Sequence, residues 1–206
     1  MARSAVATEN FSGTLGNFTQ VNPTWADLAI TSGVVHGDAT GADSGGEVGA
    51  AVYSGAGTFS NDQYSSLVIG GLSWQSLAFN IGVIVRASTD TNANRDYYQV
   101  VVASDQAGPN YTTILSKVVN GTRTQLHSAS AAWANGDRIE LEAEGTTIRV
   151  MKNGTALGGS FTQTDSALST GKPGIAGSGD STHISGDDWE GGDLTSGDTL
   201  MAQGLC

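Results

Sequence analysis

Residues 138–155 read RIELEAEGTTIRVMKNGT, and this stretch decides the class of fold. Its first half alternates apolar and acidic residues, which places three carboxylates on one face of a strand: Glu140, Glu142 and Glu144. Such alternation is the period of a half-buried β-strand. Glu144-Gly145 is interpreted as a turn, TTIRVM at 146–151 repeats the alternation, and Asn153-Gly154 is a dipeptide that favours two-residue hairpin loops. The stretch therefore predicts two successive hairpins.

The same signals recur along the chain about every ten residues, which is the spacing of a sandwich or barrel. Runs of β-branched and aromatic residues, bounded by turn residues, predict strands at 25–30, 33–37, 47–53, 64–72, 79–88, 96–104, 112–119, 122–128, 137–143, 146–151 and 155–161. We expect the last seven of these strands to form one continuous antiparallel meander. No segment shows the 3.6-residue period of a long amphipathic helix. The sequence predicts an all-β protein.

The composition predicts one folded domain. The chain has 206 residues, of which 38% are hydrophobic and only 14% charged, and it contains 29 glycines. No charged or proline-rich linker divides it, so we expect a single domain over 1–206 with a core at about 6–194 and a short arm at each end. The net charge of −11 argues against nucleic acids and anionic membranes as partners. No apolar run reaches the roughly 20 residues of a membrane helix.

Seven motifs in order resemble the concanavalin A-like, laminin-G-like jelly-roll family. They are FSGTLGNF (11–18), FSNDQYSSLVI (59–69), VIVRAS to YYQVVV (83–102), NGTRTQL (120–126), GDRIELEAEGTTIRVMKNGT (136–155), TDSALSTGKPGIAG (164–177) and DDWEGGDL (187–194). The resemblance implies an antiparallel β-sandwich with six or seven strands in each sheet, whose closing strand returns beside the N-terminal one. Members of the family include carbohydrate-binding modules, glycosidases, adhesion domains and structural parts of phage virions, so the fold alone does not fix the function.

The glutamate stripe raises the question of catalysis, because it resembles the Glu-x-Asp-x-Glu pattern that glucanases of this fold carry on one strand. A retaining glycosidase needs two carboxyl groups about 5–5.5 Å apart. Here the central residue is Glu142, one methylene longer than aspartate, and Glu144 adjoins a turn. We therefore interpret the stripe as the solvent-facing side of an amphipathic strand and expect no catalytic residues. A glycoside hydrolase acting through Glu140 and Glu144 is the weaker alternative.

A structural Ca²⁺ is implied by the resemblance, because lectin-like domains often hold one near the chain ends. SGDSTHISGDDWEGGD (178–193) offers carboxylates, of which the metal candidates are Asp180, Asp187 and Asp188. Oxygen ligands of Ca²⁺ show no diagnostic spacing here, so the alternative is a solvated acidic surface with turn-forming aspartates. The three histidines are isolated from one another in the sequence: His36, His127 and His183. We expect no cofactor other than a possible structural Ca²⁺.

The four tryptophans are candidates for a platform on which sugar rings stack: Trp25, Trp74, Trp133 and Trp189. We expect Trp25 and Trp189 to lie in the core instead, because they belong to strand-like segments. The single cysteine, Cys206, has no intrachain partner. It is either a solvent-exposed thiol or the site of an interchain disulfide.

These observations favour a non-enzymatic structural protein of a tailed-phage virion, such as a capsid decoration or tail-associated subunit. The family includes virion proteins, MARSAVATENF (1–11) lacks a recognisable leader, and the domain stands alone. The expected partners are other virion proteins or copies of the same chain in a homo-oligomer or larger assembly. The expected location is the virion, assembled in the host cytoplasm. The alternative is an extracellular carbohydrate-binding module that recognises surface glycans.

Overall fold

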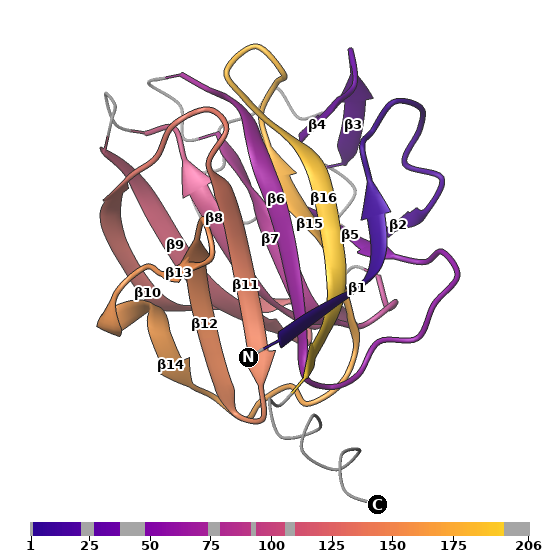
Figure 1. The fold of residues 1–206 in the computed structure, drawn as a ribbon, viewed down its shortest axis with the longest axis vertical. Coiled ribbons are helices and arrows are strands. Elements are labelled where there is room, and N and C mark those ends of the chain that lie inside the picture. The colour runs from indigo at the N-terminus through magenta and orange to yellow at the C-terminus, as the bar shows by residue number, and fades with distance from the viewer. Residues whose placement is uncertain are drawn as a thin grey trace, which may run out of the picture.

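The computed structural model describes residues 2–21, 27–37, 48–73, 79–91, 94–105 and 110–195. These residues form two antiparallel sheets that pack face to face, with sheet A in front and sheet B behind in Figure 1. The fold is therefore the all-β jelly-roll sandwich that the sequence predicts. A 3₁₀ turn, η2 (Gly159–Phe161), precedes β14, and none of the helices in the described ranges is long and apolar enough to cross a membrane.

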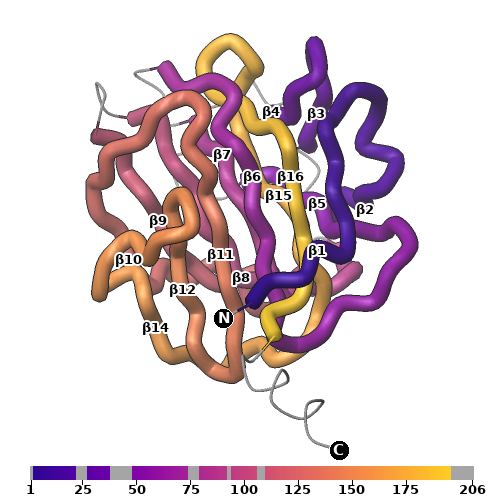
Figure 2. The backbone as a smooth tube through the Cα atoms, in the orientation of Figure 1, coloured from indigo at the N-terminus to yellow at the C-terminus, as the bar shows by residue number. Residues whose placement is uncertain are grey.

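Sheet A contains the predicted hairpins and the terminal strands. Its order is β13 (Thr155–Ala156), β12 (Thr147–Lys152), β11 (Arg138–Glu144), β6 (Gln63–Leu72), β16 (Ile184–Thr195), β4 (Val34–Gly37) and β3 (Leu28–Thr31). Two further strands join it, β1 (Ala2–Glu9) on β16 and β14 (Thr162–Thr164) on β12. The backbone trace in Figure 2 shows the earliest and latest strands lying side by side, and the ladder pairs Arg3 with Leu194. This neighbourhood confirms the predicted return of the closing strand.

Sheet B contains seven strands in the order β10 (Thr122–Ala132), β9 (Asn110–Val119), β8 (Tyr97–Ala103), β7 (Asn80–Ala87), β15 (Lys172–Ser178), β5 (Gly49–Tyr53) and β2 (Phe18–Gln20). Successive residues of its central strands face two apolar clusters. Val83 and Val100 face sheet A, whereas Ile84 and Val101 belong to a second cluster on the opposite face, and all four are fully buried. Burial on both faces explains the unbroken apolar runs in these strands. None of the residues in this second cluster belongs to sheet A.

The hairpin turns follow the sequence with one correction. Asn120-Gly121 and Asn153-Gly154 have positive φ at both residues, the pattern of a type I′ turn. The turn between β11 and β12 is Gly145-Thr146 rather than Glu144-Gly145, because Glu144 still pairs with Thr147. Gly145 has a φ of +51°, which glycine adopts without steric cost. The shift makes Glu144 the last residue of its strand.

The single meander predicted from residue 79 onwards is wrong. Strands β7 to β10 form a meander in sheet B, and the chain then crosses to sheet A, where β11 begins. Trp133 lies in this crossing segment, 2% exposed, and its indole N–H donates to Thr113 Oγ1 at 2.8 Å. The strand predicted at 155–161 ends after Ala156, because Gly158 has a φ of +119° and the chain enters η2. Alternation identifies strands but does not assign them to a sheet.

The core between the sheets is built around Trp189, which is fully buried as predicted. Its ring stacks on Tyr53 with centroids 5.3 Å apart and meets Phe18 edge-on at 5.0 Å. Its indole N–H donates to Ser65 Oγ at 2.9 Å, which satisfies the one polar group of a side chain buried at this depth. Trp25 and Trp74 lie outside the described residues, as does Cys206.

Candidate functional site on the outer face of sheet A

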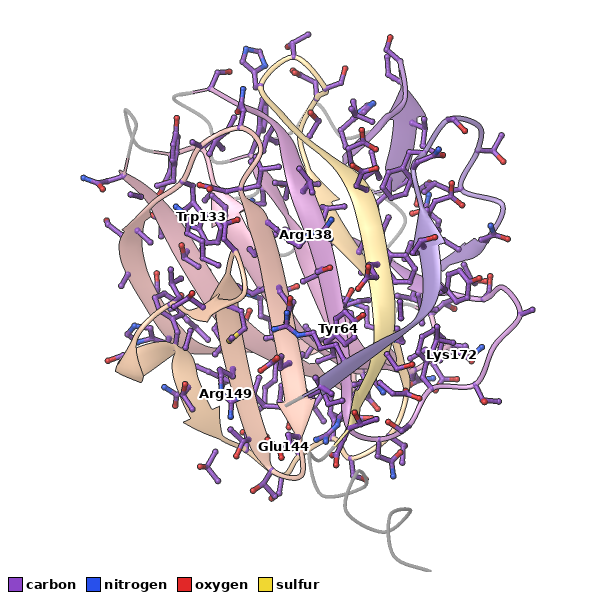
Figure 3. All side chains as sticks on the ribbon, in the orientation of Figure 1. Tyr64, Trp133, Arg138, Glu144, Arg149 and Lys172 are labelled. Carbon is purple, nitrogen blue, oxygen red and sulfur yellow. The ribbon has the colours of Figure 1, made fainter. Side chains whose placement is uncertain are left out.

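Four side chains form an ion-pair network across three strands of sheet A, which we call the Arg3 network: Arg3 of β1, Glu140 and Glu142 of β11, and Arg149 of β12. Alternation in β11 and β12 places these residues on the face opposite to Ile139, Leu141 and Val150, which are buried in the core. Figure 3 shows Arg149 on this outer face, with Tyr64 and Arg138 on neighbouring strands. Charged residues from distant parts of the chain therefore meet on one surface.

Glu140 is the most unusual member of the network, because a carboxylate on the outer face of a sheet is only 2% exposed. Arg3 Nη2 lies 2.5 Å from its Oε1. Burial raises the pKa of Glu140 to about 7; the charges of Arg3 and Arg138 oppose this shift, and the nearby carboxylate of Glu142 adds to it. Glu140 therefore titrates near neutrality.

Glu142 connects β1 and β12 through its two oxygens. Arg3 Nη2 lies 2.9 Å from Oε1, and Arg149 Nη1 lies 2.8 Å from Oε2. The residue is 4% exposed. The expectation that the glutamate stripe faces solvent is therefore wrong for Glu140 and Glu142, because a side chain from the N-terminal strand lies against both. Alternation in one strand does not reveal which other strand covers its polar face.

The geometry bears directly on the glycosidase interpretation. Of the two proposed catalytic residues, Glu140 is inaccessible beneath Arg3, whereas the side chain of Glu144 is 33% exposed and lies 3.8 Å from Arg149. A sugar in contact with Glu140 would have to displace Arg3. In this structure the stripe forms an ion-pair network between strands, and the two carboxylates do not line a common open cleft.

A pocket of about 380 Å³ lies beside this network, and we call it the β1–β16 pocket. It is lined by Thr8 and Glu9 of β1, Asn10 after it, Arg138 of β11, and Asp188, Trp189 and Glu190 of β16. Its volume is at the lower end of the roughly 300–1,000 Å³ typical of small-molecule sites. The lining is polar, in contrast to the buried faces of sheet B.

Two of the polar lining side chains are held in place by their neighbours. Arg138 Nη1 donates to Ser66 Oγ at 2.8 Å and to the carbonyl of Asp188 at 3.2 Å. Glu190 accepts a hydrogen bond from the hydroxyl of Tyr64, and burial together with this carboxylate raises the pKa of Tyr64 well above its ordinary value. Tyr64 therefore stays protonated as a donor, and both lining groups have fixed positions.

A β-bulge shapes the wall of the pocket on β16. The register between β16 and β6 shifts between Asp187 and Glu190, and Asp188 has a φ of +46°. Bulges redirect side chains and are common next to binding sites. Here Asp188 is exposed while Trp189 turns into the core. The bulge thus places a carboxylate at the rim without disturbing the buried indole.

The predicted calcium ligands are not gathered into one site among the described residues. Asp180 lies in the turn before β16, where it accepts a hydrogen bond from the backbone N–H of Thr182 at 3.0 Å and pairs with His183 at 2.7 Å. Asp187 accepts from the backbone N–H of Asp188 at 2.7 Å. Within these ranges, no group of three His, Cys, Asp or Glu residues could hold a metal ion. The Ca²⁺ site stays a prediction.

The sugar platform is not formed by Trp133 or Trp189, since both indoles are buried. Of the residues that line the pocket, sequence reasoning missed Glu9 and Arg138, and it considered Asp188 and Glu190 only as acidic residues near a Ca²⁺ site. The signal that bears on them is the predicted pairing of the N-terminal and closing strands, which brings the ends of the chain together. Nothing in the sequence indicates which of their polar residues face the same way.

Comparison with known proteins agrees with this architecture. No family model matches the chain, and no curated protein matches it. Among solved structures, the carbohydrate-binding module CBM66 from Bacillus subtilis aligns with a TM-score of 0.55 at 17% identity, over 87% of this chain and 94% of that chain. The β-glucanase of Bacillus licheniformis aligns with a TM-score of 0.56 at 9% identity, over 93% of this chain and 99% of that one. This chain has the lectin/glucanase-like jelly-roll fold.

A third jelly roll comes from a phage. The CBM2 module of an evolved Dit protein from Lactobacillus casei BL23 phage J-1 aligns with a TM-score of 0.53 at 12% identity, over 94% of this chain and 98% of that chain. At these identities the likeness establishes the fold alone. The function must be argued from the residues of this chain.

Proposed function

We propose that this jelly roll is a non-catalytic glycan-binding domain and that the β1–β16 pocket is its binding site. The observation that carries the proposal is that Arg138 and Glu190, both held by neighbouring residues, line the same polar pocket. A guanidinium donates hydrogen bonds and a carboxylate accepts them, so the pair matches neighbouring hydroxyl groups of a sugar. Because both groups are already held by other residues, little conformational entropy is lost when a ligand binds.

Two features support a binding role without hydrolysis. Glu140 is buried beneath Arg3, so the stripe in β11 presents no pair of carboxyl groups to a substrate. Several solved domains of the same fold are named as carbohydrate-binding modules or carbohydrate recognition domains. Their names do not identify the glycan or the residues that this chain uses.

The proposal is tested by screening the protein on a glycan array and measuring the strongest ligand by calorimetry. Arg138→Gln and Glu190→Gln should each weaken binding at least about tenfold, since each leaves a sugar hydroxyl without its partner. The matched control is Arg123→Gln on β10, which makes the same change of side chain on sheet B. Thermal unfolding of each variant checks that the fold is retained. Absence of glycan binding by the wild-type protein rejects the function.

A second candidate, a structural subunit of a tailed-phage virion, is favoured by the likeness to the module of phage Dit. The two roles are compatible, because a glycan-binding domain on a tail would contact the host surface. In this setting its partners would be other virion proteins or copies of the same chain. Mass spectrometry of purified particles from the source phage tests the role, and a protein found only outside the particles would refute it.

A further inference from the structure

We infer that the β1–β16 pocket selects glycans without acidic groups and excludes sugars that carry carboxylate or sulfate. This inference rests on the glycan-binding function proposed above and specifies its ligand class. The observations that carry it are the charge of the lining residues, the hydrogen bonds that these residues already make, and the acceptor groups that remain open.

Among the described residues, the lining carries three carboxylates, those of Glu9, Asp188 and Glu190, against the single guanidinium of Arg138. Asp187 lies next to Asp188 in β16 and is partly exposed. The chain as a whole has a net charge of −11. Both the pocket and the molecule therefore repel anions. Salt screens this repulsion less in a partly enclosed site than on an open surface.

The positive charge of Arg138 is already partly compensated, so it offsets this repulsion only in part. Recognition of an oxyanion by arginine is strongest when the planar fork offers two parallel N–H donors. Arg138 Nη1 already donates to Ser66 Oγ at 2.8 Å and to the carbonyl of Asp188 at 3.2 Å. Its charge also acts on the buried carboxylate of Glu140. These bonds use the end of the guanidinium at Nη1, so Nε and Nη2 can still donate to a ligand, but the charge of the group is shared with Glu140.

The acceptors in the pocket favour a ligand rich in hydroxyl donors. The carboxylate of Asp188 accepts no hydrogen bond from the described residues, and Glu190 uses one oxygen on Tyr64. Glu9 is occupied by the backbone N–H of Phe11 at 3.2 Å and by Asn17 Nδ2 at 3.1 Å. Open carboxylate oxygens pair with neutral hydroxyls, whereas an acidic sugar would bring a second carboxylate against them.

The test uses a matched pair of ligands made from one glycan. The neutral glycan that binds best on the array is oxidised at its primary hydroxyl groups to carboxylates, and both forms are measured by calorimetry. We expect the oxidised form to bind at least about tenfold more weakly at low salt. The difference in affinity between the two forms should become smaller as the salt concentration rises from about 0.01 M to about 1 M, because the Debye length falls from about 30 Å to about 3 Å. Binding of the neutral form should change little.

Removal of one carboxylate from the lining should strengthen binding of the oxidised glycan, and a damaged fold could not produce such a gain. Asp188→Asn keeps the shape of an exposed side chain, and asparagine tolerates the positive φ at this position. This variant should reduce the difference in affinity between the oxidised and neutral glycans several-fold. Asp90→Asn, which removes the same charge from an exposed site outside the lining, should leave this difference unchanged.

The outcomes separate the inference from the function on which it rests. If the oxidised form binds as tightly as the neutral form and Arg138→Gln abolishes both, the pocket binds glycans and the selectivity is wrong. If array binding is confined to acidic glycans and needs Arg138, the conclusion is the same. If no glycan binds, or if binding ignores Arg138, Asp188 and Glu190, the proposed function fails and the selectivity fails with it.

Discussion

Arg3 Nη2 lies 2.5 Å from Glu140 Oε1, so the N-terminal strand β1 is joined by an ion pair to a buried carboxylate of β11. The same nitrogen lies 2.9 Å from Glu142 Oε1. Arg3 therefore pairs with two glutamates that are 2% and 4% exposed, and Arg149 pairs with the second of them as well. Loss of Arg3 would leave two buried carboxylates without this partner, which costs free energy of folding. The contact can therefore be tested by mutation.

Replacement of Arg3 by glutamine should destabilise the fold. Removing one partner of a buried ion pair costs about 3–5 kcal/mol, but the side chain of Arg3 is 32% exposed and solvent screens part of the loss. We expect about 1–3 kcal/mol, which lowers the melting temperature by roughly 2–12 °C for a chain of this size. Circular dichroism during heating measures the change. Adding Glu140→Gln to Arg3→Gln should restore part of the stability, and a double variant no more stable than the single one would contradict the assignment.

The stability of the protein should depend on pH through Glu140. Burial raises the pKa of Glu140 from 4.5 to about 7, so the folded state binds this proton more tightly than the unfolded state does. The contribution to stability is fully present below about pH 4.5 and is lost as the pH rises through about 7. Glu140→Gln should flatten this decline, which melting temperatures between pH 4.5 and pH 8 measure. Parallel pH profiles for the wild type and Glu140→Gln would show that another group is responsible.

Replacement of Trp189 by alanine should be severely destabilising. Its ring is fully buried between the sheets, stacked on Tyr53 and edge-on to Phe18. Loss of a buried tryptophan typically costs about 3–5 kcal/mol, and Ser65 Oγ would lose a hydrogen-bond donor. Chemical denaturation followed by tyrosine and tryptophan fluorescence measures the cost. A loss below about 1 kcal/mol would indicate that the core is not organised around this residue.

The turn between β12 and β13 allows a test of backbone strain that is free of steric clash. Gly154 has a φ of +77°, and a Cβ added there meets no atom within 4 Å. Gly154→Ala should therefore cost about 1 kcal/mol from conformation alone. Gly13→Ala is the matched control, because its added Cβ also meets nothing within 4 Å and its φ is not positive. Equal melting temperatures for the two variants would argue against the left-handed conformation at Gly154.

A glycosidase would hydrolyse the glycan that it binds, whereas the proposed binding domain would not. Because Glu140 is covered by Arg3, we expect the wild-type protein to release no reducing sugar from the glycan that it binds. Glu140→Gln and Glu144→Gln should leave glycan affinity unchanged within about twofold, since neither residue lines the β1–β16 pocket. Hydrolysis by the wild type that disappears in both variants would overturn the non-catalytic proposal.

The fold could be predicted largely from the sequence, whereas the candidate site could not. Alternation in 138–155 identified β11 and β12, and Asn153-Gly154 marked the turn after β12 correctly, because these signals are local. The prediction of one meander is wrong at Trp133, because the sheet that a strand joins depends on the positions of strands that are distant in the sequence. The central strands of sheet B lost their alternation because both faces are buried.

The polar surface depended on contacts that are still more remote in the sequence. The glutamates of β11 read as solvent-facing until Arg3 is placed against them. The pocket joins Glu9 to Glu190 only because β1 pairs with β16, and the bulge at Asp188 has no local sequence signal. Pairing between the ends of a chain is a long-range property that composition and periodicity do not encode.

The pairing of β1 with β16 also has a consequence for how the molecule folds. Ala2 finds its partner Thr195 only after nearly all of the intervening chain has been made. Contacts of such large sequence separation close late, because the entropy of ordering the loop between them must be lost first. We expect Glu140 and Glu142 to stay solvated until β1 docks, because Arg3 of β1 lies against both carboxylates in the folded protein. Docking of β1 is then the step that buries them, so the rate of this late step should respond to the protonation of a group far from the N-terminus.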